Sequence, residues 1–283
     1  MSRKNFSITD LRTRYEAGEK FAMVTAYDFP SAKLAEAAGL DLLLVGDSLG
    51  TTVLGYPTTL PTTMDAMILH TAAVSRAVTS PMVIGDMPFL SFQVSVEEAV
   101  RNAGRFVVEG GAHAVKLEGV LHAEAISAIL AAGIPVMGHL GYTPQRAIQF
   151  GTQIVRAKQA DEATALLADA RKLQELGCFA LVLECIPDDL AGLVTEELDI
   201  PTIGIGAGPL CSGQVLVWHD LLGLVPGQSF KHNKRYTELG KTIIEALQQY
   251  VAEVRSGAFP DEAHCFRADP GLLEALKRRP ERD

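Results

Sequence analysis

Acidic side chains follow several short apolar runs of the chain, at the point where each run ends. Three such pairs are Leu42–Val45 with Asp47, Pro81–Gly85 with Asp86, and Phe179–Leu183 with Glu184. Runs of apolar residues without alternation predict strands that are buried on both faces, as in a parallel sheet. An unpaired charge at the end of a buried strand is costly, so we expect these carboxylates to meet a cation.

Two further runs contribute basic side chains. Ala114–Leu117 contains Lys116 and is followed by Glu118, and Ile134–Gly138 is followed by His139. Lys116 and Glu118 are two residues apart, so their side chains lie on the same side of a strand. Purely structural roles remain open, because a lysine can pair with a neighbouring carboxylate and a core histidine can simply be hydrogen-bonded.

Together these side chains suit a magnesium site with a base beside it. Oxygen donors without cysteine favour Mg²⁺ over Zn²⁺. Since Mg²⁺ usually takes one or two carboxylates, Asp47 and Asp86 are the expected direct ligands, with Glu118 beside the ion or acting through water. Glu184 suits a general base. Asp28, which precedes Pro30-Ser31, fits helix capping as well as it fits the site.

A repeat of helix, glycine, short apolar strand and polar residue indicates the architecture. It occurs at Gly39, Gly111, Gly133 and Gly177. Besides the five runs above, strands are expected at Phe21–Ala26, Pro201–Ile205 and Gln214–Val217. Eight strands alternating with helices predict a (β/α)8 TIM barrel of the α/β class, whose active site lies at the C-terminal ends of the strands.

The competing architecture is an open doubly wound sheet. It requires a phosphate-binding glycine turn after the first strand, and residues 27–30 provide none. The glycines of 204–208 are only a weak phosphate signal. We expect one domain over 1–283, with a short N-terminal helix, a functional loop at Ser48–Pro61, a peripheral helix at Thr242–Val254 and a C-terminal extension at about 267–283.

Composition excludes several classes of partner. The 283 residues are 48% hydrophobic and carry a net charge of -9, without a basic cluster, so neither nucleic acid nor an anionic membrane is expected. The most apolar stretch, 123–140, is interrupted by Glu124 and Pro135, so it predicts no membrane span. Without a signal-peptide run or a Cys-x-x-Cys motif, the four cysteines predict reduced thiols and a cytoplasmic protein.

Between about Thr25 and Phe266 the chain resembles the ketopantoate hydroxymethyltransferase (3-methyl-2-oxobutanoate hydroxymethyltransferase) family. The similarity lies in many motifs that occur in order along the chain. They include Thr25–Asp28, Val45–Gly50, Thr59–Pro61, His70–Val74, Asp86–Phe89, Val115–Gly119, Gly138–Gly141, Thr143–Gln145, Leu183–Pro187, Ile203–Gly208 and Gln214–Asp220. Local departures occur at 151–158, at Ser212, where an Asp is frequent, and in the tail after Phe266.

The resemblance implies a barrel of the phosphoenolpyruvate/pyruvate-type superfamily. Such an enzyme uses Mg²⁺ and 5,10-methylenetetrahydrofolate to convert 3-methyl-2-oxobutanoate into 2-dehydropantoate for pantothenate and coenzyme A, through a Mg-stabilised enolate. It also implies a cytoplasmic homo-oligomer, commonly a decamer of two pentamers. The implied metal residues are Asp47, Asp86 and Glu118; Asp47, Ser48, Asp86 and Lys116 contact the keto acid, with His139 expected to join them, and Glu184 accepts the proton.

Two other readings remain open at this point. A Mg²⁺-dependent carbon–carbon lyase of the phosphoenolpyruvate mutase/isocitrate lyase type would have a similar barrel. Such lyases typically carry a catalytic cysteine in a Lys-x-Cys-Gly-His segment, and Val136–His139 contains none. A non-catalytic binding barrel would show no dependence on a metal.

Overall fold

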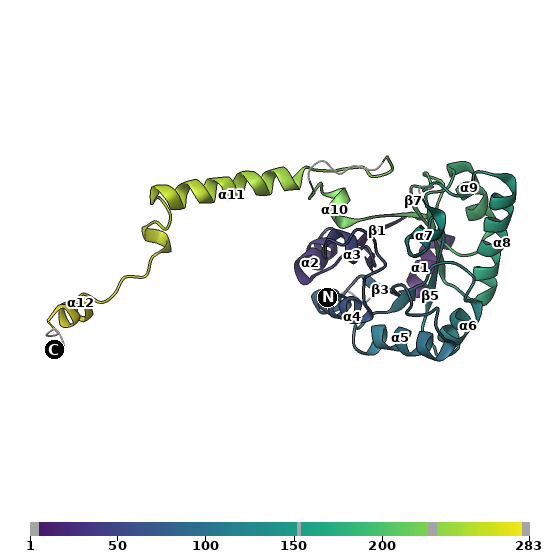
Figure 1. Cartoon of the computed structure of the whole chain (residues 1–283), viewed down its shortest axis with the longest axis horizontal. Helices are drawn as coiled ribbons and strands as arrows, with labels where there is room; N and C mark the ends of the chain where they lie inside the picture. The colour runs from purple at the N-terminus through teal and green to yellow at the C-terminus, as the bar shows by residue number, and fades with distance from the viewer. Residues whose placement is uncertain (1–5, 152–153, 226–230, 279–283) are drawn as a thin grey trace.

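The computed structural model describes residues 6–151, 154–225 and 231–278. Within them, eight parallel strands form a closed barrel in sequence order, with β8 paired to β1 (Figure 1). The strands are β1 (Phe21–Thr25), β2 (Leu42–Val45), β3 (Met82–Asp86), β4 (Ala114–Lys116), β5 (Val136–Gly141), β6 (Ala180–Glu184), β7 (Thr202–Ile205) and β8 (Gly213–Leu216). Closure excludes the open doubly wound sheet and confirms the expected (β/α)8 fold.

Helices surround most of this barrel. The longer ones are α2 (Phe29–Ala37), α4 (Met64–Ala77), α5 (Val96–Val108), α6 (Ala123–Ala131), α8 (Ala160–Leu176) and α9 (Asp188–Glu197). The N-terminal helix α1 (Ile8–Glu16) is as long as α2 and α6. Shorter elements are α3 (Leu49–Thr52), η1 (Pro144–Arg146), α7 (Ala147–Phe150) and α10 (Trp218–Leu221). Beyond the barrel lie α11 (Leu239–Ser256), η2 (Glu262–His264) and α12 (Pro270–Lys277).

The barrel interior changes from apolar to polar along the strands. Because successive side chains of a strand alternate between its two faces, every second residue points inward. The inward apolar cluster includes Met23, Leu42, Ile84 and Val182, and Leu11 of α1 packs against it. The next inward positions toward the C-terminal ends are polar, namely Asp86, Lys116, His139 and Glu184. The alternation therefore places the ionisable side chains on one face, directly above a dry core.

Three local expectations are modified by the structure. Strand β5 extends to Gly141, so His139 is an inward residue of the strand and does not follow it. The expected loop Ser48–Pro61 contains the short helix α3. Asp28 caps α2: its side chain accepts from the Ser31 amide and forms a capping box. Thr152, Gln153 and the last five residues of the expected tail lie outside the described residues.

At the β8–β1 seam, part of the outer wall is left uncovered by the described residues. The outward side chains of Ala22 on β1 and Gln214 on β8 pair in register, and both are exposed. Outer wall positions of parallel barrels are normally buried under helices. The next long helix, α11, instead projects away from the barrel, with α12 beyond it (Figure 1).

Helix α11 carries an apolar stripe that the barrel does not cover. Its members are Ile243, Ile244, Leu247, Tyr250, Val251 and Val254, all 40–57% exposed. This spacing is that of an amphipathic helix face that normally packs against another surface. In the described part of the chain, no helix is long and apolar enough to span a membrane.

Candidate active site

A buried ion pair forms the centre of the polar layer. The Lys116 ammonium donates to Asp86 Oδ1 over 2.6 Å, and both side chains are at most 4% exposed. The two residues are register partners on β3 and β4, so the pairing follows from the strand alignment. At this burial an unpaired lysine would be strongly disfavoured, and Asp86 supplies the opposite charge.

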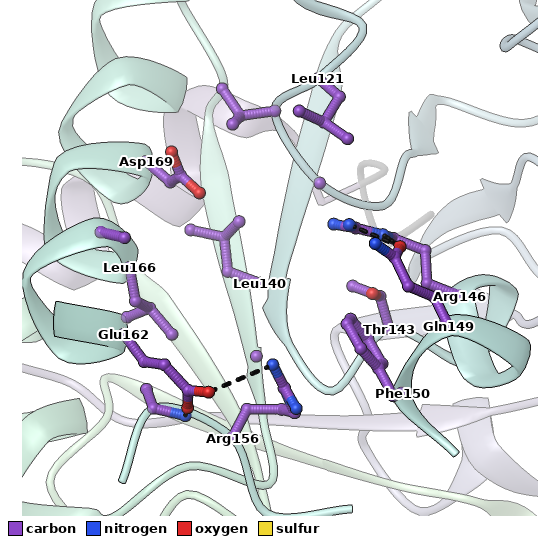
Figure 2. Close-up of a pocket in the computed structure, with 15 residues that line it drawn as sticks. Leu121, Leu140, Thr143, Arg146, Gln149, Phe150, Arg156, Glu162, Leu166 and Asp169 are labelled. Atoms are coloured by element: carbon purple, nitrogen blue, oxygen red, sulfur yellow. Dashed lines mark hydrogen bonds and ion pairs between the residues drawn. The ribbon is translucent and has the colours of Figure 1, made fainter. Parts of the chain in front are cut away.

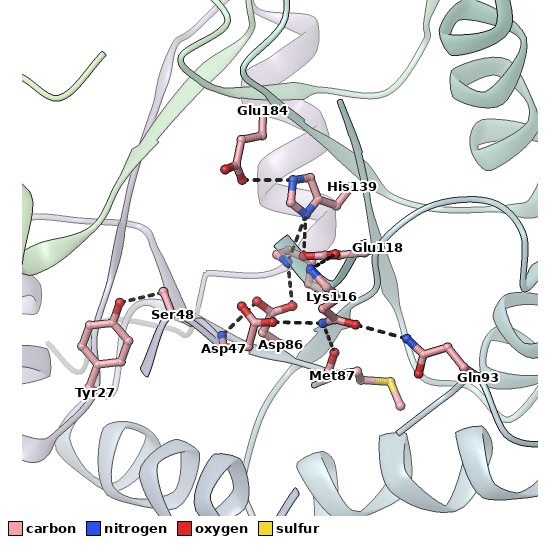
Figure 3. A network of polar contacts seen from close by, with 11 residues as sticks. Tyr27, Asp47, Ser48, Asp86, Met87, Gln93, Lys116, Glu118, His139 and Glu184 are labelled. Atoms are coloured by element: carbon pink, nitrogen blue, oxygen red, sulfur yellow. Dashed lines mark hydrogen bonds and ion pairs between the residues drawn. The ribbon is translucent and has the colours of Figure 1, made fainter. Parts of the chain in front are cut away.

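Asp47 lies beside this pair, just after β2. Its backbone amide donates to Asp86 Oδ2 over 3.1 Å, which ties the two carboxylate-bearing segments together. Its own carboxylate accepts a hydrogen bond of 3.0 Å from Gln145 Nε2. Thr62 Oγ1 donates to the Asp47 carbonyl. Figure 3 shows the Asp47 and Asp86 carboxylates side by side beneath Lys116.

His139 connects Lys116 to the two glutamates. Nδ1 lies 3.3 Å from Lys116 Nζ and 3.6 Å from Glu118 Oε1, and Nε2 lies 3.2 Å from Glu184 Oε2 (Figure 3). Glu118 Oε2 accepts from the Gln145 backbone amide, whereas its buried Oε1 has no hydrogen-bond partner among the described residues. The glutamate at the end of β6 is the most accessible of the group, with an 18% exposed side chain.

Ser48 and Asp28 lie differently from the other expected site residues. Ser48 follows Asp47 directly and bonds Tyr27 OH over 2.8 Å, at the margin of the network. Asp28 is exposed at the start of α2 and takes no part in the buried network. The structure thus brings Asp47, Asp86, Lys116, Glu118, His139 and Glu184 together, with Ser48 beside them.

The excess of buried negative charge shifts the pKa values of this layer. Burial, followed by the charges of Asp86 and Glu118, raises the pKa of Asp47 well above its usual value. Burial alone would lower the pKa of Lys116, but the surrounding carboxylates, Asp86 first, raise it above its ordinary value. The ammonium therefore stays charged at neutral pH.

The pKa of His139 is raised to about 9, because Glu118 and Glu184 outweigh burial and the nearby ammonium, which both lower it. The contact with Lys116 opposes protonation at Nδ1, because the ammonium lies only 3.3 Å from that nitrogen. Nε2 lies within ion-pair distance of Glu184, at 3.2 Å, but makes no hydrogen bond among the described residues. We therefore assign the role of this ring to the charge that it places beside Glu184 when it is protonated.

The donor set is compatible with a magnesium ion. Asp47 and Asp86 offer hard oxygen donors side by side, and Glu118 Oε1 is buried without a hydrogen bond. Among the described residues, no three His, Cys, Asp or Glu side chains converge as a ready-made metal cluster. Mg²⁺ does not require one, because it commonly takes one or two protein carboxylates and fills its shell with water and substrate oxygens.

Gln145 is the site residue for which the sequence suggested no role. Its side chain is only 4% exposed, donates to both Asp47 and the Met87 carbonyl, and accepts from Gln93. It holds two of the carboxylates at once, Asp47 through its side chain and Glu118 through its backbone. Its signals were its place in the polar segment after β5 and in the motif Thr143–Gln145, and neither assigned it a role.

This arrangement can bind an anionic, oxygen-rich molecule and remove a proton from it. A buried ammonium beside paired carboxylates suits a dication and a substrate carrying two oxygens. Glu184, less buried and oriented by His139, can accept a proton at the edge of the same site.

Comparison by sequence relates nearly the whole chain to one family. The family model described as ketopantoate hydroxymethyltransferase matches residues 5–262. A 3-methyl-2-oxobutanoate hydroxymethyltransferase from Moorella thermoacetica is 54% identical over 266 residues, covering 94% of this chain and 99% of its own length. The protein of the same name from Chloroflexus aurantiacus is 53% identical over 270 residues, with 95% of each chain covered.

Comparison by structure identifies similar barrels with distant sequences. A phosphonopyruvate hydrolase in complex with oxalate and Mg²⁺ aligns with a TM-score of 0.59 at 14% identity, over 95% of this chain and 94% of its own. A 2,3-dimethylmalate lyase of the phosphoenolpyruvate mutase/isocitrate lyase superfamily gives 0.59 at 18% identity, over 95% and 96%. At these identities the likeness shows the shared fold alone, so it does not favour the lyase reading.

We expect the substitution Gln145→Leu to destabilise the protein. It removes the donor to Asp47 and leaves a buried carboxylate oxygen without that bond, at a cost of about 1–3 kcal/mol. The free energy of unfolding from urea titration measures the effect. The control is Gln159→Leu at the start of α8, where the exposed side chain makes no capping bond. Equal stabilities of the two variants would contradict the role assigned to Gln145.

Proposed function

The chain belongs to the ketopantoate hydroxymethyltransferase family, a family of one-carbon transferases, and we propose that it converts 3-methyl-2-oxobutanoate to 2-dehydropantoate with 5,10-methylenetetrahydrofolate as donor. It is a transferase, like its close relatives. The observation that carries the proposed chemistry is the single buried layer in which Lys116 and Glu184 flank His139. One group there stabilises negative charge and the other takes a proton, as an enolate-forming reaction requires.

Substrate binding rests on Asp47, Asp86 and Lys116 in this proposal. A magnesium ion held by Asp47 and Asp86, with Glu118 nearby, would supply Lewis-acid stabilisation of charge on the keto acid's oxygens. Lys116 offsets the substrate's negative charge in a site from which water is largely excluded. Ser48 and His139 complete the surroundings of the keto acid.

Proton removal is assigned to Glu184. Its carboxylate takes the proton from C3 of the keto acid, and the electron pair of that C–H bond moves to the keto oxygen. His139 Nε2 lies 3.2 Å from the Glu184 carboxylate, so the charge of the protonated ring helps to hold that carboxylate in position. Lys116 faces the side on which negative charge develops, so its charge favours the enolate over the keto form.

Carbon–carbon bond formation completes the transfer. C3 of the enolate forms a bond to the methylene carbon, and the keto group is restored. Water supplies the hydroxyl oxygen, and both bonds between the one-carbon unit and the folate nitrogens N5 and N10 break. The proton removed from C3 and one proton of the water pass to these two nitrogens. Tetrahydrofolate and 2-dehydropantoate are the balanced products.

We also propose a cytoplasmic location. Cys178, Cys185, Cys211 and Cys265 are all free thiols, and the first three are buried. A long chain with unpaired cysteines fits a reducing compartment.

We further propose one barrel domain for the whole chain, assembled as a homo-oligomer in which α11 of one copy covers the β8–β1 seam of another. Two unpartnered surfaces support this: the exposed strand positions Ala22 and Gln214, and the apolar stripe of α11. Because α11 is the long helix that follows β8, its packing over β8 and β1 would have covered both surfaces. A decamer of two pentamers, as in the family, is the expected assembly.

The purified protein should form 2-dehydropantoate from 3-methyl-2-oxobutanoate and methylenetetrahydrofolate only when a divalent cation is present. EDTA is expected to abolish product formation, and titrated Mg²⁺ to restore it, because three buried carboxylates need a compensating charge. Product is measured by mass spectrometry. Turnover that EDTA leaves unchanged would rule out the metal-dependent mechanism.

Glu184→Gln should stop C3 exchange while leaving keto-acid binding intact. The amide keeps the size of the side chain but cannot take the proton, so exchange of the C3 proton with deuterium should fall about 10²-fold or more. NMR in D₂O follows the exchange, and calorimetry gives the affinity for the keto acid. The matched control is Glu175→Gln on the exposed surface of α8. Normal exchange in Glu184→Gln would remove this residue from the role.

Leu247→Glu should break the assembly without unfolding the barrel. Leu247 is 57% exposed in a single chain, so a charge there costs little until the helix docks on a second copy. Light scattering after size exclusion should give a smaller mass than for the wild type, with unchanged circular dichroism. Glu245→Gln, off the apolar stripe, serves as the control. A wild-type monomer would refute the docking of α11.

A further inference from the structure

A cavity of about 500 Å³ lies beside the proposed catalytic layer, and the steps of the proposed function leave it unused. It is bounded by the segments that follow β4 and β5, by α7 and by α8 (Figure 2). Leu121, Leu140, Leu166 and Phe150 provide apolar walls, and Arg146, Arg156, Glu162 and Asp169 provide charges. A few polar groups among apolar walls, in a cavity of this size, are typical of a site for an organic ligand.

The cavity adjoins the reacting groups through its backbone. Its wall includes Gly119 and Leu140, the residues directly after Glu118 and His139. Gly141, also in the wall, packs so closely that a Cβ there would lie 2.1 Å from the Glu184 carbonyl oxygen. The cavity wall is therefore built from residues adjacent in the chain, or packed against the backbone, of the groups that we assign to proton removal.

Two polar groups in the cavity wall lack protein partners. Thr143 is 3% exposed, and its Oγ1 has no hydrogen bond among the described residues. The Asp169 carboxylate makes no hydrogen bond or ion pair within the described part of the chain; burial raises its pKa, and the charge of Arg146 opposes that shift. Buried polar groups are normally satisfied, so Thr143 Oγ1 points to a ligand, and the partly buried Asp169 carboxylate offers an acceptor in the same cavity.

Two arginines beside an aromatic ring form the cationic part of the cavity. The Arg156 guanidinium lies 4.2 Å from the centre of the Phe150 ring, and that of Arg146 lies 5.2 Å from it. Stacked guanidinium groups beside an aromatic ring bind planar rings and carboxylates. Arg156 also contacts Glu162 over 3.6 Å, which positions it at the edge of the cavity.

We propose that this cavity binds the folate co-substrate, with Asp169 receiving the two N–H donors of the pterin edge and the arginines facing the glutamate carboxylates. The assignment rests on the proposed function, which requires a reduced folate beside the keto acid. The pterin's amino and ring N–H groups match a carboxylate, the benzoyl ring matches the apolar walls, and the anionic tail matches Arg146 and Arg156. The same position brings the one-carbon unit next to the segment that carries Glu184.

Binding of 5-formyltetrahydrofolate, measured by calorimetry, tests the assignment without turnover. Asp169→Asn should weaken binding about 10-fold or more, because a hydrogen bond to a charged group is lost. Leu121→Trp, at a 71% exposed rim position, should also weaken it by filling the cavity entrance. The controls are Asp161→Asn, exposed on the same helix, and Leu69→Trp, 66% exposed on α4; both should bind within about twofold of wild type.

Deuterium exchange at C3 of the keto acid separates a failure of the cavity assignment from a failure of the proposed function, because exchange needs no folate. Asp169→Asn should exchange at the wild-type rate and show a raised KM for methylenetetrahydrofolate, with an unchanged KM for the keto acid. Wild-type folate affinity in both Asp169→Asn and Leu121→Trp would overturn the cavity assignment and leave the proposed function intact. Absence of exchange in the wild type would overturn the proposed function, and this assignment with it.

Discussion

The constraint on which the site depends is the burial of several carboxylates around one ammonium. Asp47, Asp86 and Glu118 are each no more than 6% exposed, and Lys116 is the fully buried cation among them. Buried charges of one sign repel strongly, and desolvation adds to the cost. These charges lie at the C-terminal ends of the strands, where parallel barrels bind ligands that can compensate the cost.

The barrel permits this arrangement because apolar side chains fill one layer of its interior and ionisable side chains occupy the next. Inward apolar residues such as Ile84 and Val182 fill the interior below, and the same alternation delivers Asp86 and Glu184 one layer higher. Hydrogen bonds then fix the side chains relative to one another. Gln145 holds the carboxylate side, and His139 links the ammonium to the proposed base. A shift of any one of these groups changes the environment of the others.

The incomplete outer wall has the same origin as the protruding arm. Most strands have a long helix packed behind them, whereas the exposed wall positions of β1 and β8 adjoin a helix that extends away. The apolar stripe of α11 and the uncovered strand pair would both be stabilised if another surface packed against them. The proposed exchange of α11 between copies satisfies both surfaces with one contact, and it links the stability of each barrel to the assembly.

The sequence by itself determined the fold and most members of the polar layer. Eight short apolar runs with glycine-terminated helices specified a closed parallel barrel, because fully buried strands and βα repeats have few other arrangements. The ionisable residues at the ends of several of these runs were visible for the same reason. Local pattern was weaker at the ends of elements: His139 lies within β5, and Asp28 caps a helix in place of joining the site.

Only the tertiary structure decided which of these residues touch and what lies beside them. The motif Thr143–Gln145 gave Gln145 no role, because an amide in a polar loop looks like any surface residue until Asp47 and Glu118 are placed around it. The cavity beside β5 and the uncovered seam were likewise invisible, since each is made by segments distant in the chain. Sequence patterns report which face a side chain occupies; contacts between elements depend on the register and packing of the closed barrel.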